Sequence, residues 1–77
     1  MTLGNKIKEL RESSGLLQRE LAYRLNLGEG YLSKIESDQK KISREHLETI
    51  SKIFNEPIEE LEKLWLGNKI YLSLIHI

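Results

Sequence analysis

Four side chains between positions 29 and 34 carry groups that can contact the edges of nucleic-acid bases. Glu29 can accept a hydrogen bond from the amino group of cytosine, Lys34 can donate one to guanine, and the ring edge of Tyr31 can touch the methyl group of thymine. Ser33 adds a hydroxyl that can donate or accept, and Gly30 leaves a gap beside these groups. One short helix in the major groove of duplex DNA could present all five positions to the base pairs.

The two glycines at the start of this segment need an explanation, because glycine costs a helix about 1 kcal/mol relative to alanine. Gly28 is expected at the N-cap, where glycine is acceptable. Glu29 would then lie in the first turn, where its charge favours the positive end of the helix. For Gly30 two interpretations stay open. Its missing side chain lets the helix lie deeper in the groove, or it is a tolerated poor helix former.

The residues before this segment predict another helix, which packs across the one just described. Apolar residues at helical spacing favour one helix over residues 18–25 and a second over about 29–37. Asn26 falls at the break, where it tolerates the left-handed backbone conformation, and Leu27 can fill the turn. Ala22 supplies the small residue that two closely crossing helices need. The shared core would contain Leu21, Leu32 and Ile35. The pattern is that of a helix-turn-helix.

Signals for helix ends flank the predicted motif on both sides. Thr2 can cap a helix that runs to about Ser14, and Gly15 can end it. Ser43 can cap another helix that runs to about Phe54. Helices this short are stable only when they bury their apolar faces against one another.

A last helix is predicted from Pro57, a residue that suits the first turn, after Asn55 ends the helix before it. Gly67 and Asn68 either interrupt this last helix or end it. No segment alternates with the period of two that marks a strand. We therefore expect an all-α, compact five-helix bundle in one domain over residues 1–71, with the helix-turn-helix at about residues 18–37.

Composition excludes several classes of function. The chain of 77 residues suffices for one small core, and the absence of cysteine excludes disulfides and thiolate metal sites. No grouping of side chains suggests catalysis or metal ligation, so we expect no enzyme activity, cofactor, metal or small-molecule ligand. No signal peptide or membrane-spanning run is present, which predicts a cytoplasmic protein.

Charge is unevenly distributed although the formal net charge is zero. Residues 1–44 hold nine Lys or Arg against six Asp or Glu, whereas residues 45–77 hold three against six. A basic first half suits a domain that turns one face to a polyanion. An evenly solvated surface is an equal alternative.

One set of residues carries a resemblance to a known family, namely Ile7, Leu10, Arg11, Gly15, Leu16, Gln18, Leu21, Ala22, Leu32, Ser33, Ile35 and Glu36. Through them the chain resembles the Cro/CI-type (XRE-like) helix-turn-helix regulators of phages and bacteria over roughly residues 3–64. The resemblance implies a phage-repressor-like fold and a sequence-specific regulator that acts as a homodimeric repressor on an operator with an inverted repeat. Asn26 departs from the family, which more often has glycine there. Leu17 stands where a capping Ser or Thr is common, which predicts a weaker helix start.

Phosphate contacts should flank the recognition helix. The resemblance implies that Gln18, at the start of the preceding helix, binds a DNA phosphate. Lys40 and Lys41, in the loop after the recognition helix, are well placed to do the same, and the alternative is an ordinary solvated pair. Arg19 is a further candidate, with simple solvation an equal alternative. Such contacts set position and affinity but carry no sequence preference.

Arg11 and Glu36 are expected to pair. In the resembled family an arginine of the first helix pairs with the glutamate that ends the recognition helix, and both positions match here. A partly buried pair would hold the recognition helix on the scaffold. Removing one partner would cost more than the pair contributes, because the other charge would be left unpaired.

The segment over residues 61–71 further resembles small regulators found beside restriction-modification genes. Leu61, Leu64 and Trp65 are candidate dimer contacts, since aromatic residues are enriched at the centres of interfaces. Core packing is an equal alternative for Trp65. A rival hypothesis for the whole chain is a protein-interaction module, such as the antitoxin of a toxin–antitoxin pair, which would bind its partner through the acidic last two helices.

Residues 72–77, LSLIHI, have a separate explanation. They are the translation of CTG TCT CTT ATA CAC ATC, the mosaic end of a transposase adapter used to build sequencing libraries. These residues are therefore predicted to be an adapter-derived, non-native tail that was never selected to pack in this fold. The alternative is a genuine apolar tail.

Overall fold

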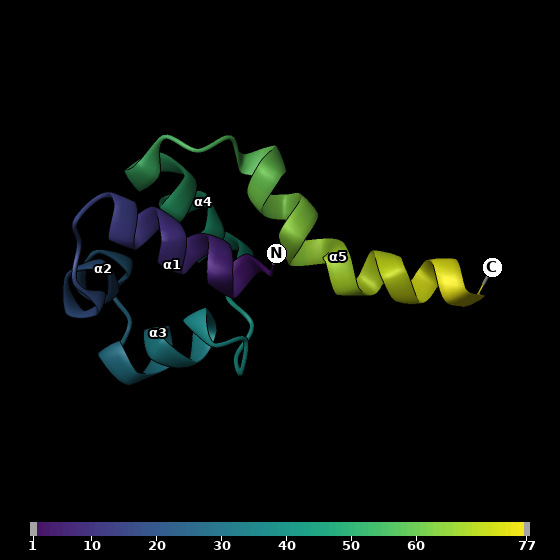
Figure 1. Cartoon of the computed structure of the whole chain (residues 1–77), viewed down its shortest axis with the longest axis horizontal. Helices are drawn as coiled ribbons and strands as arrows, with labels where there is room; N and C mark the ends of the chain where they lie inside the picture. The colour runs from purple at the N-terminus through teal and green to yellow at the C-terminus, as the bar shows by residue number, and fades with distance from the viewer. Residues whose placement is uncertain (1, 77) are drawn as a thin grey trace.

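Over residues 2–76, the computed structural model consists of five helices joined by short turns (Figure 1). It describes the backbone of residues 2–76 and the side chains of residues 2–67. The helices are α1 (Leu3–Ser13), α2 (Gln18–Leu25), α3 (Glu29–Glu36), α4 (Arg44–Phe54) and α5 (Ile58–His76). No strand occurs between residues 2 and 76, so the predicted all-α fold is confirmed.

The helix ends follow the local chemistry that the sequence predicts. Thr2 Oγ1 accepts a hydrogen bond of 3.1 Å from the first turn of α1, and Ser43 Oγ accepts one of 3.3 Å from the first turn of α4. Both hydroxyls therefore act as N-caps. Asn26 ends α2 with a φ of 58° and Asn55 ends α4 with a φ of 53°. Asparagine tolerates this left-handed conformation better than most residues.

The start of α2 lacks a side-chain N-cap, as expected from Leu17. Leu17 occupies the capping position, and its aliphatic side chain offers no acceptor to the first turn. Glu20 partly compensates, because its Oε1 accepts a hydrogen bond of 2.9 Å from the backbone N–H of Leu17. This contact is one half of a capping box, so the start of α2 is supported from within the helix.

The core is shared by all five helices. α3 packs against α1 and α2, and α5 packs against α4 and α1. The core side chains are Ile7, Leu21, Ala22, Leu25, Leu32, Ile35, Ile42, Leu47, Ile50 and Leu61. Figure 1 shows α3 along one edge of the molecule, so only one of its sides can face this core.

α5 is the longest helix and continues through Gly67, where the sequence left an interruption or an end open. A single internal glycine costs about 1 kcal/mol, which does not by itself end a helix. Figure 1 shows that the last part of α5 leaves the globule and points away from the other helices. The predicted adapter-derived tail, residues 72–77, lies outside the residues whose side chains the structure describes.

Candidate nucleic-acid interface

α3 has one buried side and one solvent-facing side. Leu32, Ile35 and Glu36 face inward, each with at most 5% of its surface exposed. The predicted base-contacting residues are all exposed, namely Glu29, Gly30, Tyr31, Ser33 and Lys34. Residues three and four apart lie on one face of a helix, so positions 30, 33 and 34 form the centre of the outward face. Glu29 and Tyr31 flank it on opposite sides.

The glycines at the start of α3 are not required by the packing of the domain. Gly28 is the N-cap, as predicted, with a φ of −71° that any residue can adopt. A Cβ atom at Gly30 would meet nothing within 4 Å in the described structure. The space beside Gly30 is therefore open to solvent or to DNA, and both interpretations of this glycine still stand.

A buried ion pair holds the other end of α3. Arg11 Nε donates to Glu36 Oε2 at 2.8 Å, and Arg11 Nη2 donates to Oε1 at 3.1 Å. This bidentate geometry is the strongest form of an arginine–carboxylate contact. The guanidinium also donates to the carbonyl oxygen of Leu16 at 2.9 Å, which ties the turn after α1 to the same pair.

The environment of Arg11 favours its charged form. The hydrogen bond to Glu36 raises the pKa of Arg11 above its usual range, although burial acts in the opposite direction. A cation whose pKa is raised on folding contributes its stabilisation at every pH below its unfolded-state pKa, and loses it only as the pH rises through the folded-state value. For an arginine this loss lies at strongly alkaline pH.

Gln18 joins the same cluster from the start of α2. Its Nε2 donates to Glu36 Oε1 at 3.0 Å, so three helices meet at one carboxylate. A primary amide carries two N–H donors, and Glu36 occupies one of them. The half-buried Gln18 can therefore hold the helix pair together and still offer a donor to a phosphate.

The other candidate phosphate contacts lie at the ends of the helix-turn-helix. Arg19 is exposed in the first turn of α2. Lys40 and Lys41 are exposed in the loop after α3, where the backbone N–H of Lys40 donates to the carbonyl oxygen of Lys34 at 3.3 Å. This bond keeps the start of the loop against the last turn of α3. The candidate cations are therefore exposed on two elements, one before α3 in the chain and one after it.

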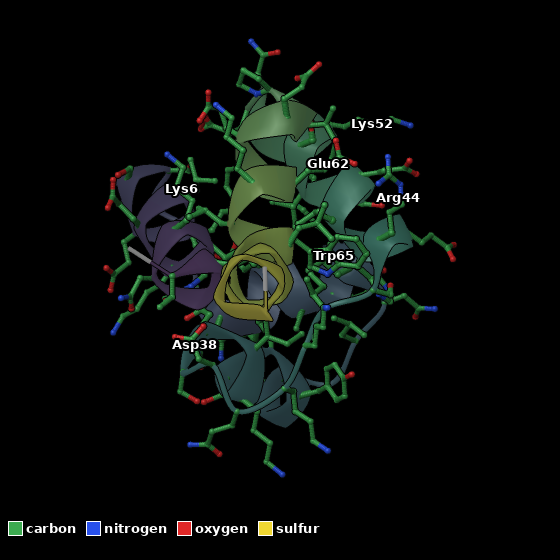
Figure 2. All side chains as sticks on the ribbon, turned by 90° about the vertical axis from the view of Figure 1, so that its right-hand side faces the viewer. Lys6, Asp38, Arg44, Lys52, Glu62 and Trp65 are labelled. Atoms are coloured by element: carbon green, nitrogen blue, oxygen red, sulfur yellow. The ribbon has the colours of Figure 1, made fainter. Side chains whose placement is uncertain are left out.

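A second clamp on α3, which the sequence did not reveal, involves Asp38. Its Oδ2 accepts a hydrogen bond of 2.7 Å from Thr2 Oγ1, and its Oδ1 accepts one of 3.2 Å from the backbone N–H of Gly4. Figure 2 shows Asp38 between α1 and α3. A carboxylate at the start of a helix is favourable because the free N–H groups there carry partial positive charge. Asp38 thus fastens the segment after α3 to the start of α1.

Gly4 makes this contact possible. A Cβ atom at this position would lie 2.5 Å from the carbonyl oxygen of Ile35 and 2.7 Å from that of Glu36. Both are backbone atoms, so α1 and α3 could not approach as closely with any other residue here. The signal in the sequence was a glycine inside the first turn of a predicted helix, which often marks close packing.

Tyr23 is a further residue that sequence reasoning passed over. It is 86% exposed on α2, one helical turn after Arg19. Phenol hydroxyls are among the groups that bind DNA phosphates. The signal was available in the helical spacing, which places position 23 opposite the buried Leu21, Ala22 and Leu25.

The candidate dimer contacts separate into two kinds. The prediction that Leu61 contacts a second copy is wrong, because Leu61 has no exposed area and belongs to the core. Leu64 and Trp65 are half-buried. Trp65 Nε1 donates to the carbonyl oxygen of Ile42 at 2.7 Å, and Lys41 Nζ lies 4.8 Å from the centre of a Trp65 ring. Trp65 therefore packs on the domain itself, and part of its surface stays accessible.

Neither a metal site nor a membrane-spanning helix is found among the described residues. No group of three His, Cys, Asp or Glu side chains there could hold a metal ion. In the same part of the chain, no helix has both the length and the apolar character needed to cross a membrane.

Comparisons with known proteins agree with this architecture. The family model for helix-turn-helix proteins (HTH_3) matches residues 7–61. The chain is 36% identical over 55 residues to the HTH-type transcriptional regulator ImmR of Bacillus subtilis (strain 168). That match covers 71% of this chain and 43% of ImmR, so the chain spans less than half the length of this relative. No solved structure matches the chain.

The fold and the exposed second helix of the motif define a helix-turn-helix domain. The chain belongs to the Cro/CI-type (XRE-like) family of DNA-binding transcriptional regulators.

Proposed function

We propose that this domain reads a specific duplex DNA sequence through α3, binds its operator as a homodimer and represses transcription. The observation that carries the proposal is the division of α3 into a side fixed in the core and an exposed side with polar groups. A recognition helix must be held rigidly and still present its side chains to the base edges.

Base recognition is assigned to the exposed side of α3. Lys34 would donate to a guanine, Glu29 would accept from a cytosine amino group, and Tyr31 would contact a thymine methyl group. Ser33 would bind either a donor or an acceptor on a base edge. The open space at Gly30 would let the backbone of α3 come close to the groove floor.

Phosphate binding is assigned to the residues that flank this helix. Gln18 and Arg19 would contact one strand from the start of α2, and Lys40 and Lys41 would contact the backbone from the loop after α3. Neutralising phosphates releases condensed counterions, so the affinity should fall steeply with salt. Because phosphates are the same at every base pair, these residues would set affinity and register.

A homodimer would place two copies of α3 about 34 Å apart, one helical turn of DNA, on an operator with an inverted repeat. Leu64 and the accessible part of Trp65 are the proposed contacts, because they are half-buried residues on α5. The similarity to a protein named as a transcriptional regulator supports the regulatory role. Repression is the role that the resemblance to the Cro/CI-type family implies.

The decisive experiment is selection of bound duplexes from a random pool, followed by affinity measurements at several salt concentrations. We expect an enriched inverted repeat, with a Kd of about 10⁻⁸–10⁻¹¹ M at physiological salt. Equal affinity for all duplexes, or no dependence on salt, would contradict the proposal. Failure to enrich any duplex would favour the antitoxin-like alternative.

A matched control is available in Lys52→Ala. Lys52 is an exposed lysine of α4, and Figure 2 shows it at the end of the molecule opposite to α3. Removing its charge should leave the affinity for the selected operator nearly unchanged, whereas removing the charge of Lys41 should weaken binding to every duplex. Sedimentation of the free protein and of the complex tests the dimer, and a strictly monomeric protein in both samples would reject it.

A further inference from the structure

We infer that Trp65 is a positioning residue for DNA binding, which couples α5 to the phosphate-binding loop between α3 and α4. The inference rests on the proposed function, because it requires that Lys41 binds DNA phosphates. It adds a role for a residue on a helix that does not itself face the proposed DNA surface.

The contacts of Trp65 converge on two neighbouring residues of this loop. The indole N–H donates to the carbonyl oxygen of Ile42 at 2.7 Å, and the ammonium group of Lys41 lies 4.8 Å from the centre of a Trp65 ring. The side chain of Ile42 is itself buried in the core. The loop is therefore held at Ile42 in two ways. The side chain of Ile42 packs in the core, and its carbonyl oxygen accepts the indole hydrogen bond from α5.

The ring contact bears on how Lys41 meets DNA. A cation is attracted to the face of an indole at this distance, so the ring restricts the positions that the flexible Lys41 side chain visits. Ordering a long side chain on binding costs conformational entropy, and a side chain that is already ordered loses less. Trp65 would thus prepare Lys41 for its phosphate contact.

The same contacts make α5 sensitive to DNA. Figure 2 shows Trp65 beside the segment that leads into α4, and Figure 1 shows α5 leaving the globule beyond this point. If a DNA phosphate approaches Lys41 while its ammonium group lies over the ring, the electrostatic environment of the indole must change. Coupling between two binding events is reciprocal, so association of two copies through α5 should in turn strengthen DNA binding.

Fluorescence provides the first test, because the chain contains one tryptophan and its emission reports Trp65 alone. Titration of the wild-type protein with a duplex that carries one half-site of the selected operator, where no second copy contacts Trp65, should change the emission of Trp65. The Lys41→Ala variant, whose altered residue is exposed, should show a much smaller change at saturating DNA. An unchanged wild-type emission on binding would overturn the inference.

Affinity measurements provide the second test. Trp65→Phe keeps an aromatic face and removes the N–H donor, whereas Trp65→Leu removes both. We expect the affinity for all duplexes to fall about threefold for Trp65→Phe and about tenfold for Trp65→Leu, with the base preference unchanged, since phosphate contacts carry no sequence information. On a duplex with a single half-site, where the proposed dimer contact of Trp65 does not contribute, the effect of Trp65→Leu should nearly vanish in a Lys41→Ala background, because residues that act through one another are not additive.

Phe54→Leu is the matched control for general destabilisation. Phe54 is a half-buried aromatic residue that packs on the core from the end of α4. This variant should lower the unfolding temperature and leave the DNA affinity of the folded protein unchanged. Equal losses of affinity for Phe54→Leu and Trp65→Leu, or additive effects of Trp65 and Lys41, would overturn the inference. If the wild-type protein bound no DNA, the proposed function itself would fail, which is a distinguishable result.

Discussion

The two ends of α3 are built in opposite ways. At its C-terminal end, Glu36 is bound by Arg11 and Gln18, and Asp38 just beyond the helix is bound by Thr2 and Gly4. At its N-terminal end, Gly28 and Gly30 have open space where a side chain would be. A helix held at one end and open at the other can be oriented by the scaffold and still fit its exposed first turns to another surface.

The two glycines at positions 4 and 30 show the same contrast. Gly4 is required by the fold, because a Cβ atom there would collide with two carbonyl oxygens of α3. Gly30 is not required by the fold. A glycine without a packing reason on an exposed helix face is either a tolerated helix former or has its reason in what the helix binds.

Breaking the ion pair at the clamped end should have the largest effect. Glu36→Ala leaves the guanidinium of Arg11 buried without its carboxylate, and we expect a loss of about 3–5 kcal/mol in the free energy of unfolding. Chemical denaturation measures it. Glu60→Ala, which removes an exposed carboxylate 3.7 Å from Lys63, is the control and should change stability little. Similar losses of unfolding free energy for the two variants would show that the buried ion pair contributes no more than an exposed one.

Filling the close contact between α1 and α3 should have the next largest effect. Gly4→Ala inserts a methyl group against backbone atoms that cannot rotate away, and overpacking of this kind costs about 1–3 kcal/mol. Denaturation of the variant checks the value. An unchanged stability would mean that α1 and α3 can move apart without loss, so that the contact does not orient the recognition helix.

Two lysine variants should distinguish base contacts on the exposed side of α3 from phosphate contacts beside it. Lys34→Ala should lose about 1–3 kcal/mol of discrimination at one base pair, whereas Lys41→Ala should weaken binding to all duplexes and lower the salt slope by about one. Binding to the operator and to its single-base variants, at several salt concentrations, measures both. If the two variants behaved alike, the assignment of α3 as the recognition helix would be wrong.

Gly30→Ala tests the open end directly. The added methyl group meets no atom of the described structure, and alanine is a better helix former than glycine. The variant should therefore gain up to about 1 kcal/mol in stability. If the missing side chain lets α3 lie deeper in the groove, the same variant should bind its operator more weakly. A gain in stability with unchanged affinity would instead support the interpretation that Gly30 is merely tolerated.

Deletion of residues 72–77 should have the smallest effect. If this segment is adapter-derived, as the sequence predicts, its removal should change the free energy of unfolding by no more than about 0.5 kcal/mol. Thermal and chemical denaturation of the shortened chain test the expectation. A loss of several kcal/mol, or a genomic copy of the gene that encodes LSLIHI followed by a stop codon, would identify a native tail.

Much of the fold was determined by the sequence itself, because its signals are local. Hydroxyl side chains at Thr2 and Ser43 and asparagines at 26 and 55 begin or end helices through contacts within a few residues. Helical spacing then separated the buried side of α3 from its exposed side. The base-contacting candidates followed from that separation, and all of them are exposed in the structure.

The partners of each helix face were decided only by the tertiary structure. Leu61 and Trp65 are four positions apart, so helical spacing places them on one face of α5. It could not show that Leu61 enters the core while the indole of Trp65 donates to the carbonyl oxygen of Ile42. The contact between Gly4 and Asp38 joins residues 34 positions apart. A periodic pattern tells which side of a helix is buried, whereas the residue it meets depends on how the helices cross. Those crossings arise from packing the whole core at once.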